Sequence, residues 1–409
     1  MTLPTLQELP RVPAAEVYKL GRRAAVLSRR PDGVEFRYLD EYLDNPGPAV
    51  ATTLPISPEP IFTPAGALPP YFAGLLPEGR RLTALRRAVK TSADDDLSVL
   101  LGIGVDAIGD VQVLPVGFAP YEVPPMVNGS DYSRVSFREL FARAVGGDPD
   151  RVGLPGAQEK VSARMITLPV QGSGTSHLLK LNPPELPALV ENEAFFLEAG
   201  RRSGLRVADA SVVTDAEGAT GLLVQRFDRR VEEDGRLAAL AFEDGCQVLG
   251  RYPADKYALT AEQVCVALCS HTRAAPVAAR ELLRQLAFAY LTGNGDAHAK
   301  NLAILWEPPG EWRVSPAFDL PASYLYGDTT VALPIGGRGG ADIPRRAFVE
   351  FGRQLGLSER AVNRALDELC ECVDLWLPEL DSLPFDAGLL RKLRRTVGYR
   401  RRLMSGLAA

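Results

Sequence analysis

Segments that look like strands and segments that look like helices are segregated along this chain of 409 residues. Short apolar runs bounded by turn residues, which are typical of strands, dominate 15–63 and 153–230. From about residue 241 onward, apolar residues recur at helical spacing, for example along 283–291 and 362–373. Because strands and helices do not alternate regularly, the sequence predicts an α+β fold and not a doubly wound parallel sheet.

Turn and capping residues place some elements more closely. A Pro-Asp-Gly turn at 31–33 stands between two apolar runs and indicates a β-hairpin. Ser92 is the expected N-cap of a helix that runs through 97–102. Three aspartates at 94–96 would then lie in its first turn, where the helix dipole favours acidic residues. A further helix is expected at about 187–203.

A proline-rich and polar stretch between 118 and 150 indicates a connector. We therefore expect three parts: a β-rich N-terminal subdomain over 1–120, a small β-rich lobe over 121–230 and a helical lobe over 231–409.

Composition argues against several classes of protein. Lys and Arg number 46 against 51 Asp and Glu, and a net charge of −5 disfavours a general nucleic-acid coat. Five cysteines without a CxxC pair, and only three histidines, disfavour a disulfide framework and a zinc site. The N-terminus lacks the pattern of a signal peptide, and no run of 18 apolar residues occurs. We therefore expect a cytoplasmic protein without a membrane partner.

The most informative segment is Gly-Asp-Ala-His-Ala-Lys-Asn at 295–301, between a long amphipathic helix and an apolar strand. Asp296 and Asn301 are five residues apart, as in kinase catalytic loops, where the Asp takes the proton of the substrate hydroxyl and the Asn holds Mg²⁺. Eighteen residues later, Asp319 follows Phe318 at the place of a second metal-binding Asp. A simple capped turn would explain either residue alone, but the whole pattern favours phosphoryl transfer.

Two upstream segments are candidates for contacts with nucleotide phosphates. Glycines within 152–160 would let backbone N–H groups approach an anion, but the spacing is not that of a Walker A loop. Taken alone, this segment is better explained as a plain turn into a strand. Lys180 lies in an apolar strand, where its charge is costly unless it is paired. Phosphates and a carboxylate of the next helix, Glu191 or Glu193, would pair with it; the alternative is an edge-strand lysine in water. In a two-lobed kinase, the hinge would run through the polar strand end at 225–229; taken alone, this segment is only a polar strand end.

Taken in order, these motifs resemble the HipA-family serine/threonine kinases, the toxins of HipBA-type toxin–antitoxin modules, over nearly the full chain. The resemblance implies a two-lobed protein-kinase-like fold. It would have a β-rich N-terminal lobe with an added N-terminal subdomain and an all-helical C-terminal lobe. The motifs that carry the resemblance are 68–79, 104–112, 156–160, 177–180, 190–193, 224–229, 243–247, 295–301 and 318–319.

The resemblance also implies the roles of individual residues. Asp296 would be the catalytic base, and Asn301 and Asp319 would bind Mg²⁺. Lys180 would contact the phosphates of ATP. The other cofactor-binding residues would be Pro155, Gly156, Ala157, Gln158, Glu159 and Lys160 in a nucleotide loop, Gln225, Arg226 and Phe227 in the hinge, and His298, Ala299, Lys300 and Phe318 together with Asn301 and Asp319.

The implied function is that of an ATP- and Mg²⁺-dependent kinase that arrests growth by phosphorylating a translation component such as an aminoacyl-tRNA synthetase. The implied partner is a HipB-like helix-turn-helix antitoxin, through which DNA would be contacted only indirectly. A first alternative is a nucleotide-binding corepressor of such an antitoxin without transfer activity. A second is a lipid or small-molecule kinase, since the loop at 295–301 also resembles phosphoinositide kinase loops. The lack of a basic amphipathic membrane helix weakens the lipid version.

One position departs from the family pattern. Gly153 stands where the best-known members carry a serine whose autophosphorylation silences the kinase, and Ser162 is the nearest downstream hydroxyl. We therefore expect an active kinase with altered autoregulation. The stretch 385–409 holds seven basic residues and one acid, Asp386. A solvated helix face explains it; the alternative is a surface for DNA, tRNA or an acidic partner.

Overall fold

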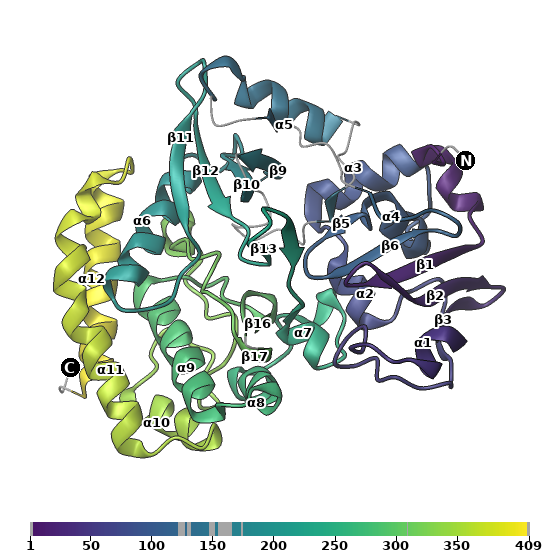
Figure 1. Ribbon diagram of the computed structural model, residues 1–409. Helices are drawn as coiled ribbons and strands as arrows, with labels where there is room; N and C mark the ends of the chain where they lie inside the picture. The colour runs from purple at the N-terminus through teal and green to yellow at the C-terminus, as the bar shows by residue number, and fades with distance from the viewer. Residues whose placement is uncertain are drawn as a thin grey trace.

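The computed structural model describes residues 3–121, 127–128, 132–146, 152–153, 166–172, 175–308 and 310–406. Figure 1 shows a strand-rich N-terminal part, in purple and blue, on one side of the molecule. The C-terminal helices, in green and yellow, occupy the other side, and a second group of strands lies beside both. This separation of sheets from helices confirms the predicted α+β fold.

The N-terminal subdomain is built on an antiparallel sheet with the strand order β4-β3-β2-β1-β6. The predicted hairpin is confirmed, because Arg30 pairs with Gly33 across the Pro-Asp turn. The strands are β1 (Ala14–Lys19), β2 (Arg22–Arg30), β3 (Gly33–Tyr38), β4 (Ile61–Pro64) and β6 (Val111–Pro115).

Four helices pack against this sheet and form one hydrophobic core with it. The helix expected near 97–102 begins at Asp96, and its N-cap is Asp95, whose side chain accepts a hydrogen bond from the N–H of Ser98. The prediction of Ser92 as the cap is wrong, because it lies too far ahead of the first helical turn. The helices are α1 (Asp40–Asp44), α2 (Pro70–Leu75), α3 (Gly79–Val89) and α4 (Asp96–Ile103), with the 3₁₀ helix η1 (Leu6–Arg11) ahead of the sheet.

The second sheet has the strand order β11-β12-β10-β9-β7. Helix α6 flanks this sheet at the position expected from the sequence. A short parallel pair of strands, β5 with β8, links this part of the chain to the N-terminal subdomain. Its elements are β7 (Val127–Asn128), β9 (Ile166–Gly172), β10 (Thr175–Leu181), β11 (Ala210–Thr214), β12 (Thr220–Gln225), η2 (Tyr132–Arg134), α5 (Phe137–Gly146) and α6 (Leu189–Arg202), and the parallel pair is β5 (Asp106–Ala107) with β8 (Val152–Gly153).

The C-terminal lobe is mainly helical, and the apolar stripes predicted along 283–291 and 362–373 lie in α9 and α11. Its elements are β13 (Arg229–Val231), β14 (Leu237–Ala239), β15 (Phe242–Asp244), α7 (Gly245–Val248), η4 (Pro253–Asp255), α8 (Ala261–His271), α9 (Ala275–Thr292), η5 (Ala299–Asn301), β16 (Ala303–Glu307), β17 (Glu311–Val314), η6 (Ser323–Tyr326), α10 (Arg345–Gln354), α11 (Glu359–Trp376), η7 (Leu377–Ser382) and α12 (Ala387–Ser405).

The expectation of an all-helical C-terminal lobe is corrected by these short strands. The apolar run after the loop at 295–301 forms β16, which pairs with β15 on one side and β17 on the other. In this small sheet Ile304 and Leu305 are buried, and β15 contacts η5, which is the end of the loop. Among the helices of the described residues, none has the length and apolar character of a membrane span.

One hydrophobic core crosses from the second sheet into the helical lobe. The ring of Trp376 on α11 packs edge-on against Phe196 of α6 and Phe288 of α9, with centroid distances of 6.1 Å and 6.3 Å. Helix α6 therefore packs with the C-terminal helices. The predicted domain boundaries near residues 120 and 230 stay predictions. The boundary near 230 would divide this shared core.

Glu243 joins the N-terminal subdomain to the helical lobe. Its carboxylate accepts hydrogen bonds from the backbone N–H and the hydroxyl of Thr52, at 2.8 Å and 2.6 Å. Burial raises the pKa of Glu243 to about 7, against the opposing effects of the Thr52 hydrogen bonds and of Lys19. The contact between the two parts therefore includes a carboxyl group that titrates near neutral pH.

We expect Glu243 to make the folded protein less stable as the pH rises from about 4.5 to about 7. Between these values the folded carboxyl keeps a proton that the unfolded chain releases. At about 1.4 kcal/mol per pKa unit, the loss is on the order of 3 kcal/mol. Urea unfolding at about pH 5 and pH 8 should show a smaller loss for Glu243→Gln than for the wild type. An equal loss in both proteins would contradict this, and exposed Glu233→Gln is the control.

Candidate active site

The loop that carries the predicted catalytic motif follows directly on α9. That helix ends as predicted at Gly293, whose φ of 79° is the left-handed conformation that glycine adopts most readily. A Cβ on Gly295 would lie 2.6 Å from the backbone oxygen of Thr330 and 2.8 Å from a carboxylate oxygen of Asp328. The loop thus passes so close to the neighbouring turn that position 295 has no room for a side chain.

Asp296, the predicted catalytic base, is only 3% exposed. Its Oδ1 atom accepts a hydrogen bond of 2.6 Å from the hydroxyl of Tyr257, and its backbone N–H donates to the side chain of Asn294 at 3.0 Å. Burial, together with the charge of Asp296, raises the pKa of Tyr257, so the phenol stays protonated as the donor. Tyr257 and Asn294 are absent from the predicted site, and Tyr257 lies 39 positions before Asp296.

The two predicted metal ligands lie beside each other. The amide nitrogen of Asn301 donates to Oδ2 of Asp319 at 3.3 Å, and the amide oxygen accepts from the N–H of His298 at 3.1 Å. Asp319 has a φ of 53°, a left-handed conformation that costs a non-glycine residue roughly 1–2 kcal/mol. Asn294 donates to its backbone oxygen at 3.1 Å. Such strain is often found at functional sites.

Lys180 connects these loops to the second sheet. It lies on β10, between β12 and β9, and is only 9% exposed, so the alternative of an edge-strand lysine in water is wrong. Its Nζ atom is 2.7 Å from Oε1 of Glu193 on α6 and also forms an ion pair with Asp319. Glu191, the other candidate partner, instead accepts a hydrogen bond of 2.5 Å from Thr220. The structure therefore selects Glu193.

The charges of this cluster depend on one another. Burial opposes the positive charge of Lys180, but Asp319 and Glu193 outweigh it and raise the pKa of the ammonium group. Burial raises the pKa of Glu193 despite the nearby ammonium, and the charge of Asp319 acts in the same direction. Lys180 thus stays protonated between two carboxyl groups, which is the charge state needed to bind phosphate.

The donor groups at Asn301 and Asp319 fit Mg²⁺, which prefers oxygen ligands. Protein sites for Mg²⁺ commonly use one or two side chains and leave the remaining positions to phosphates and water. The described part of the chain has no group of three or more His, Cys, Asp or Glu residues that would hold a metal. Metal binding here stays a prediction.

The remaining predicted residues of the catalytic loop, His298, Ala299 and Lys300, are all buried. The ring of His298 packs edge-on against Tyr257 at a centroid distance of 5.1 Å. Ala299 is buried, and its N–H donates to the backbone oxygen of Lys256 at 3.3 Å. Lys300 bonds to Asp244 at 2.7 Å and to the backbone oxygen of Gly74 at 3.1 Å. The ammonium of Lys300 thus contacts the N-terminal subdomain and not the cluster around Asp319, and its phosphate contact stays a prediction.

The predicted hinge is held by backbone and side-chain bonds. The N–H groups of Gln225 and Arg226 donate to the backbone oxygens of Asp209 and Ser176, at 2.8 Å and 2.9 Å. Phe227 packs against Phe242 and Phe318, with ring centroids 6.0 Å and 5.6 Å away. Phe318, the residue before Asp319, therefore reaches the hinge, while adenine binding by 225–227 stays a prediction.

The guanidinium of Arg226 belongs to a buried ion cluster. It contacts Asp228 at 2.9 Å and Asp106 of β5 at 2.9 Å, and Arg229 reaches the same two carboxylates at 2.7 Å. Burial would raise the pKa of Asp228, but the two arginines lower it to about 2. The cluster ties the hinge to the N-terminal subdomain.

The predicted nucleotide loop, Pro155, Gly156, Ala157, Gln158, Glu159 and Lys160, lies outside the described residues, as does Ser162. Gly153 is described and pairs with Ala107 in the parallel pair of β8 and β5. Strand β8, just before the predicted nucleotide loop, therefore pairs with β5. Asp106 of β5 is also the residue that forms ion pairs with Arg226 and Arg229.

Part of the basic stretch at the C-terminus has a structural role. Arg400 is buried, lies 4.7 Å from the ring centroid of Tyr290 and donates to its backbone oxygen at 2.5 Å. Arg401 pairs with Asp374 at 2.8 Å, and Arg394 with Asp381 at 3.0 Å. The exposed members that leave room for a partner are Arg391, Lys392, Arg395 and Arg402.

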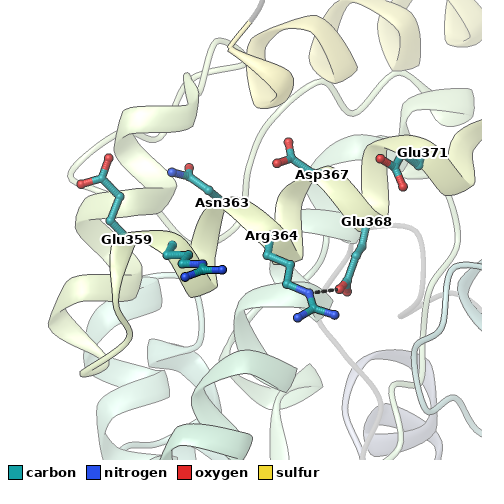
Figure 2. Close-up of a pocket in the computed structure, with 7 residues that line it drawn as sticks. Glu359, Asn363, Arg364, Asp367, Glu368 and Glu371 are labelled. Carbon is teal, nitrogen blue, oxygen red and sulfur yellow. Dashed lines mark hydrogen bonds and ion pairs between the residues drawn. The ribbon is translucent and has the colours of Figure 1, made fainter.

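A separate hollow runs along the outer face of α11, with charged side chains that project from this one helix (Figure 2). Arg364 donates to Glu368 at 3.0 Å within it. The hollow contains neither Asp296 nor the predicted metal ligands, so it is not part of the candidate active site. Its lining residues are Glu359, Arg360, Asn363, Arg364, Asp367, Glu368 and Glu371.

Comparison with known families accounts for this arrangement of subdomain, sheet and helical lobe. The model of the HipA-like C-terminal domain matches residues 152–376, and that of the HipA N-terminal domain matches 15–114. The chain belongs to the HipA family. The residues carrying the predicted site, from the nucleotide loop to Asp319, all fall within the match to the C-terminal domain.

Individual proteins are also similar to this chain over much of its length. Y4mE of Sinorhizobium fredii is 30% identical over 408 residues, which cover 92% of this chain and 94% of Y4mE. The serine/threonine-protein kinase toxin HipA of Shewanella oneidensis is 24% identical over 279 residues, 63% of this chain and 64% of that protein. A solved complex of Shewanella oneidensis HipA, HipB and operator DNA contains a chain with a TM-score of 0.75 and 19% identity. That alignment covers 97% of this chain and all of the other, and it shows the shared fold.

Proposed function

We propose that this chain is an ATP- and Mg²⁺-dependent serine/threonine protein kinase that acts as the toxin of a HipBA-type module. Its substrate would be a component of translation, such as an aminoacyl-tRNA synthetase, and its activity would arrest growth. The carrying observation is the buried contact of Lys180 with both Glu193 and Asp319, close to the loop of Asp296 and Asn301. This combination is the one that kinases use to hold phosphates and metal.

In the proposed reaction, the substrate hydroxyl attacks the γ-phosphorus of ATP. A bond forms between the hydroxyl oxygen and phosphorus while the bond to the oxygen shared with the β-phosphate breaks, and ADP leaves. Asp296 accepts the hydroxyl proton, and Lys180 holds phosphate oxygens. Mg²⁺, held by Asn301 and Asp319, would neutralise charge on the β- and γ-phosphates.

The proposed partner is a HipB-like helix-turn-helix antitoxin in the cytoplasm. A solved structure that shares this fold is a complex of HipA with HipB and operator DNA, which supports this assignment. DNA contact by this chain would be indirect, through the antitoxin. Because Gly153 has no hydroxyl, silencing by phosphorylation at that position would be lost.

Transfer of label from γ-labelled Mg-ATP into the proteins of a bacterial lysate tests the kinase activity. Wild type and Asp296→Asn are compared in parallel, and a band labelled only by the wild type identifies the substrate by mass. Bound ATP with no labelled band would contradict the kinase proposal and favour a nucleotide-binding corepressor. Label in lipids or small molecules instead of protein would favour the other alternative.

A further inference from the structure

Tyr257 lies beside the catalytic loop, although it belongs to the segment between η4 and α8. Its hydroxyl is 2.6 Å from Oδ1 of Asp296, a distance typical of a strong hydrogen bond to a charged acceptor. The phenol donates and the carboxylate accepts. One of the two carboxylate oxygens of the predicted base is therefore in contact with a phenolic hydroxyl of the protein itself.

The ring of Tyr257 is held in place by its surroundings. The preceding residue, Lys256, is fully buried and pairs with Glu78 of the N-terminal subdomain at 2.6 Å. The ammonium of Lys256 lies 5.4 Å from the centroid of the Tyr257 ring. The backbone oxygen of Lys256 accepts a hydrogen bond from the N–H of Ala299, and the ring of His298 packs edge-on against Tyr257. The phenol is thus anchored to the catalytic loop and, through Lys256, to the N-terminal subdomain.

We propose that Tyr257 is a positioning residue that orients the carboxylate of Asp296 for proton transfer; this inference rests on the proposed kinase function. The backbone N–H of Asp296 donates to Asn294, so it does not orient the carboxylate. With Oδ1 held by the phenol, the direction of Oδ2 toward an incoming hydroxyl is fixed before the substrate arrives. Catalytic groups that are oriented in advance lower the barrier of the chemical step.

The test is a double-mutant cycle with Tyr257→Phe and Asp296→Asn in the full-length chain. The rate of label transfer from γ-labelled Mg-ATP into lysate protein is measured at several ATP concentrations. Tyr257→Phe alone should lower kcat by about 10- to 100-fold, the effect of losing one hydrogen bond to a charged group, without changing KM for ATP. Added to Asp296→Asn, the same change should have little further effect, because the base that it orients is gone.

The control is Tyr42→Phe, which removes a buried hydroxyl that donates to Pro48 at 2.7 Å in the N-terminal subdomain and should leave kcat unchanged. Thermal unfolding and ATP binding verify that each variant is folded. An unchanged kcat in Tyr257→Phe, or an equal loss in both backgrounds, would overturn the proposal. A raised kcat would also overturn it, since the phenol would then compete with the substrate hydroxyl. Normal transfer by Asp296→Asn would instead refute the kinase function itself.

Discussion

Replacing Asp296 with asparagine should lower the rate of phosphoryl transfer by about 10²–10⁴-fold, the range expected when a general base is lost. The amide has nearly the same shape as the carboxylate, and its oxygen can still accept the hydrogen bond from Tyr257. It cannot take up the proton of the substrate hydroxyl at neutral pH. Asp296 is the one acidic residue in the sequence of the loop 295–301, so no other carboxylate of that loop can replace it.

Binding of ATP should be unaffected by this change, because Lys180, Asn301 and Asp319 keep their side chains. Equilibrium binding of ATP and initial rates of transfer, measured on the same preparations, separate the two properties. Asp374→Asn is a suitable control, since this exposed carboxylate only pairs with Arg401 on the helical lobe. A transfer rate in Asp296→Asn within about threefold of the wild type would show that Asp296 is not the base.

Replacing Lys180 with methionine should destabilise the fold by about 3–5 kcal/mol, the usual result of removing one partner from a buried ion pair. Methionine fills a similar volume, but it leaves Glu193 buried without its cation, next to Asp319. Transfer should be lost as well, since the ammonium is the proposed phosphate ligand. Urea unfolding, with circular dichroism as the probe, gives the free energy of unfolding.

The double variant Lys180→Met with Glu193→Leu distinguishes stability from catalysis. It removes both charges of the pair, so it should recover a large part of the lost free energy of unfolding. It should not recover transfer. Lys392→Met, which changes an exposed lysine of α12, is the control for loss of positive charge and should be as stable as the wild type. A Lys180→Met protein that unfolds at the same urea concentration as the wild type would argue against a buried pair.

Local elements of the fold could be predicted well from the sequence. The hairpin around 31–33 and the helices that carry the stripes at 283–291 and 362–373 depend on turn residues and on apolar periodicity. Both of these are local properties of the chain. The predicted N-cap at Ser92 failed because three successive aspartates compete for the cap, and only packing decides where the helix begins.

The candidate site was predictable in part. Asp296 and Asn301 lie in one short loop, so their proximity follows from their spacing. The sequence could not decide between Glu191 and Glu193 as the partner of Lys180. Two residues that are two apart on a helix point in different directions, and the sequence does not show which side of the helix faces Lys180. Helix α6 packs against β11 and β12 of the sheet, and in this arrangement Glu193 contacts Lys180 while Glu191 contacts Thr220.

The sequence by itself determined the fold class, the family resemblance and the candidate base and metal ligands, because these depend on local periodicity and on the order of short motifs. Only the tertiary structure decided which side chains meet across the molecule. Lys300 contacts the N-terminal subdomain, Lys256 pairs with Glu78, and Tyr257 donates to Asp296. These contacts join residues that are 39 to 226 positions apart, and no local pattern encodes how separate elements pack against each other.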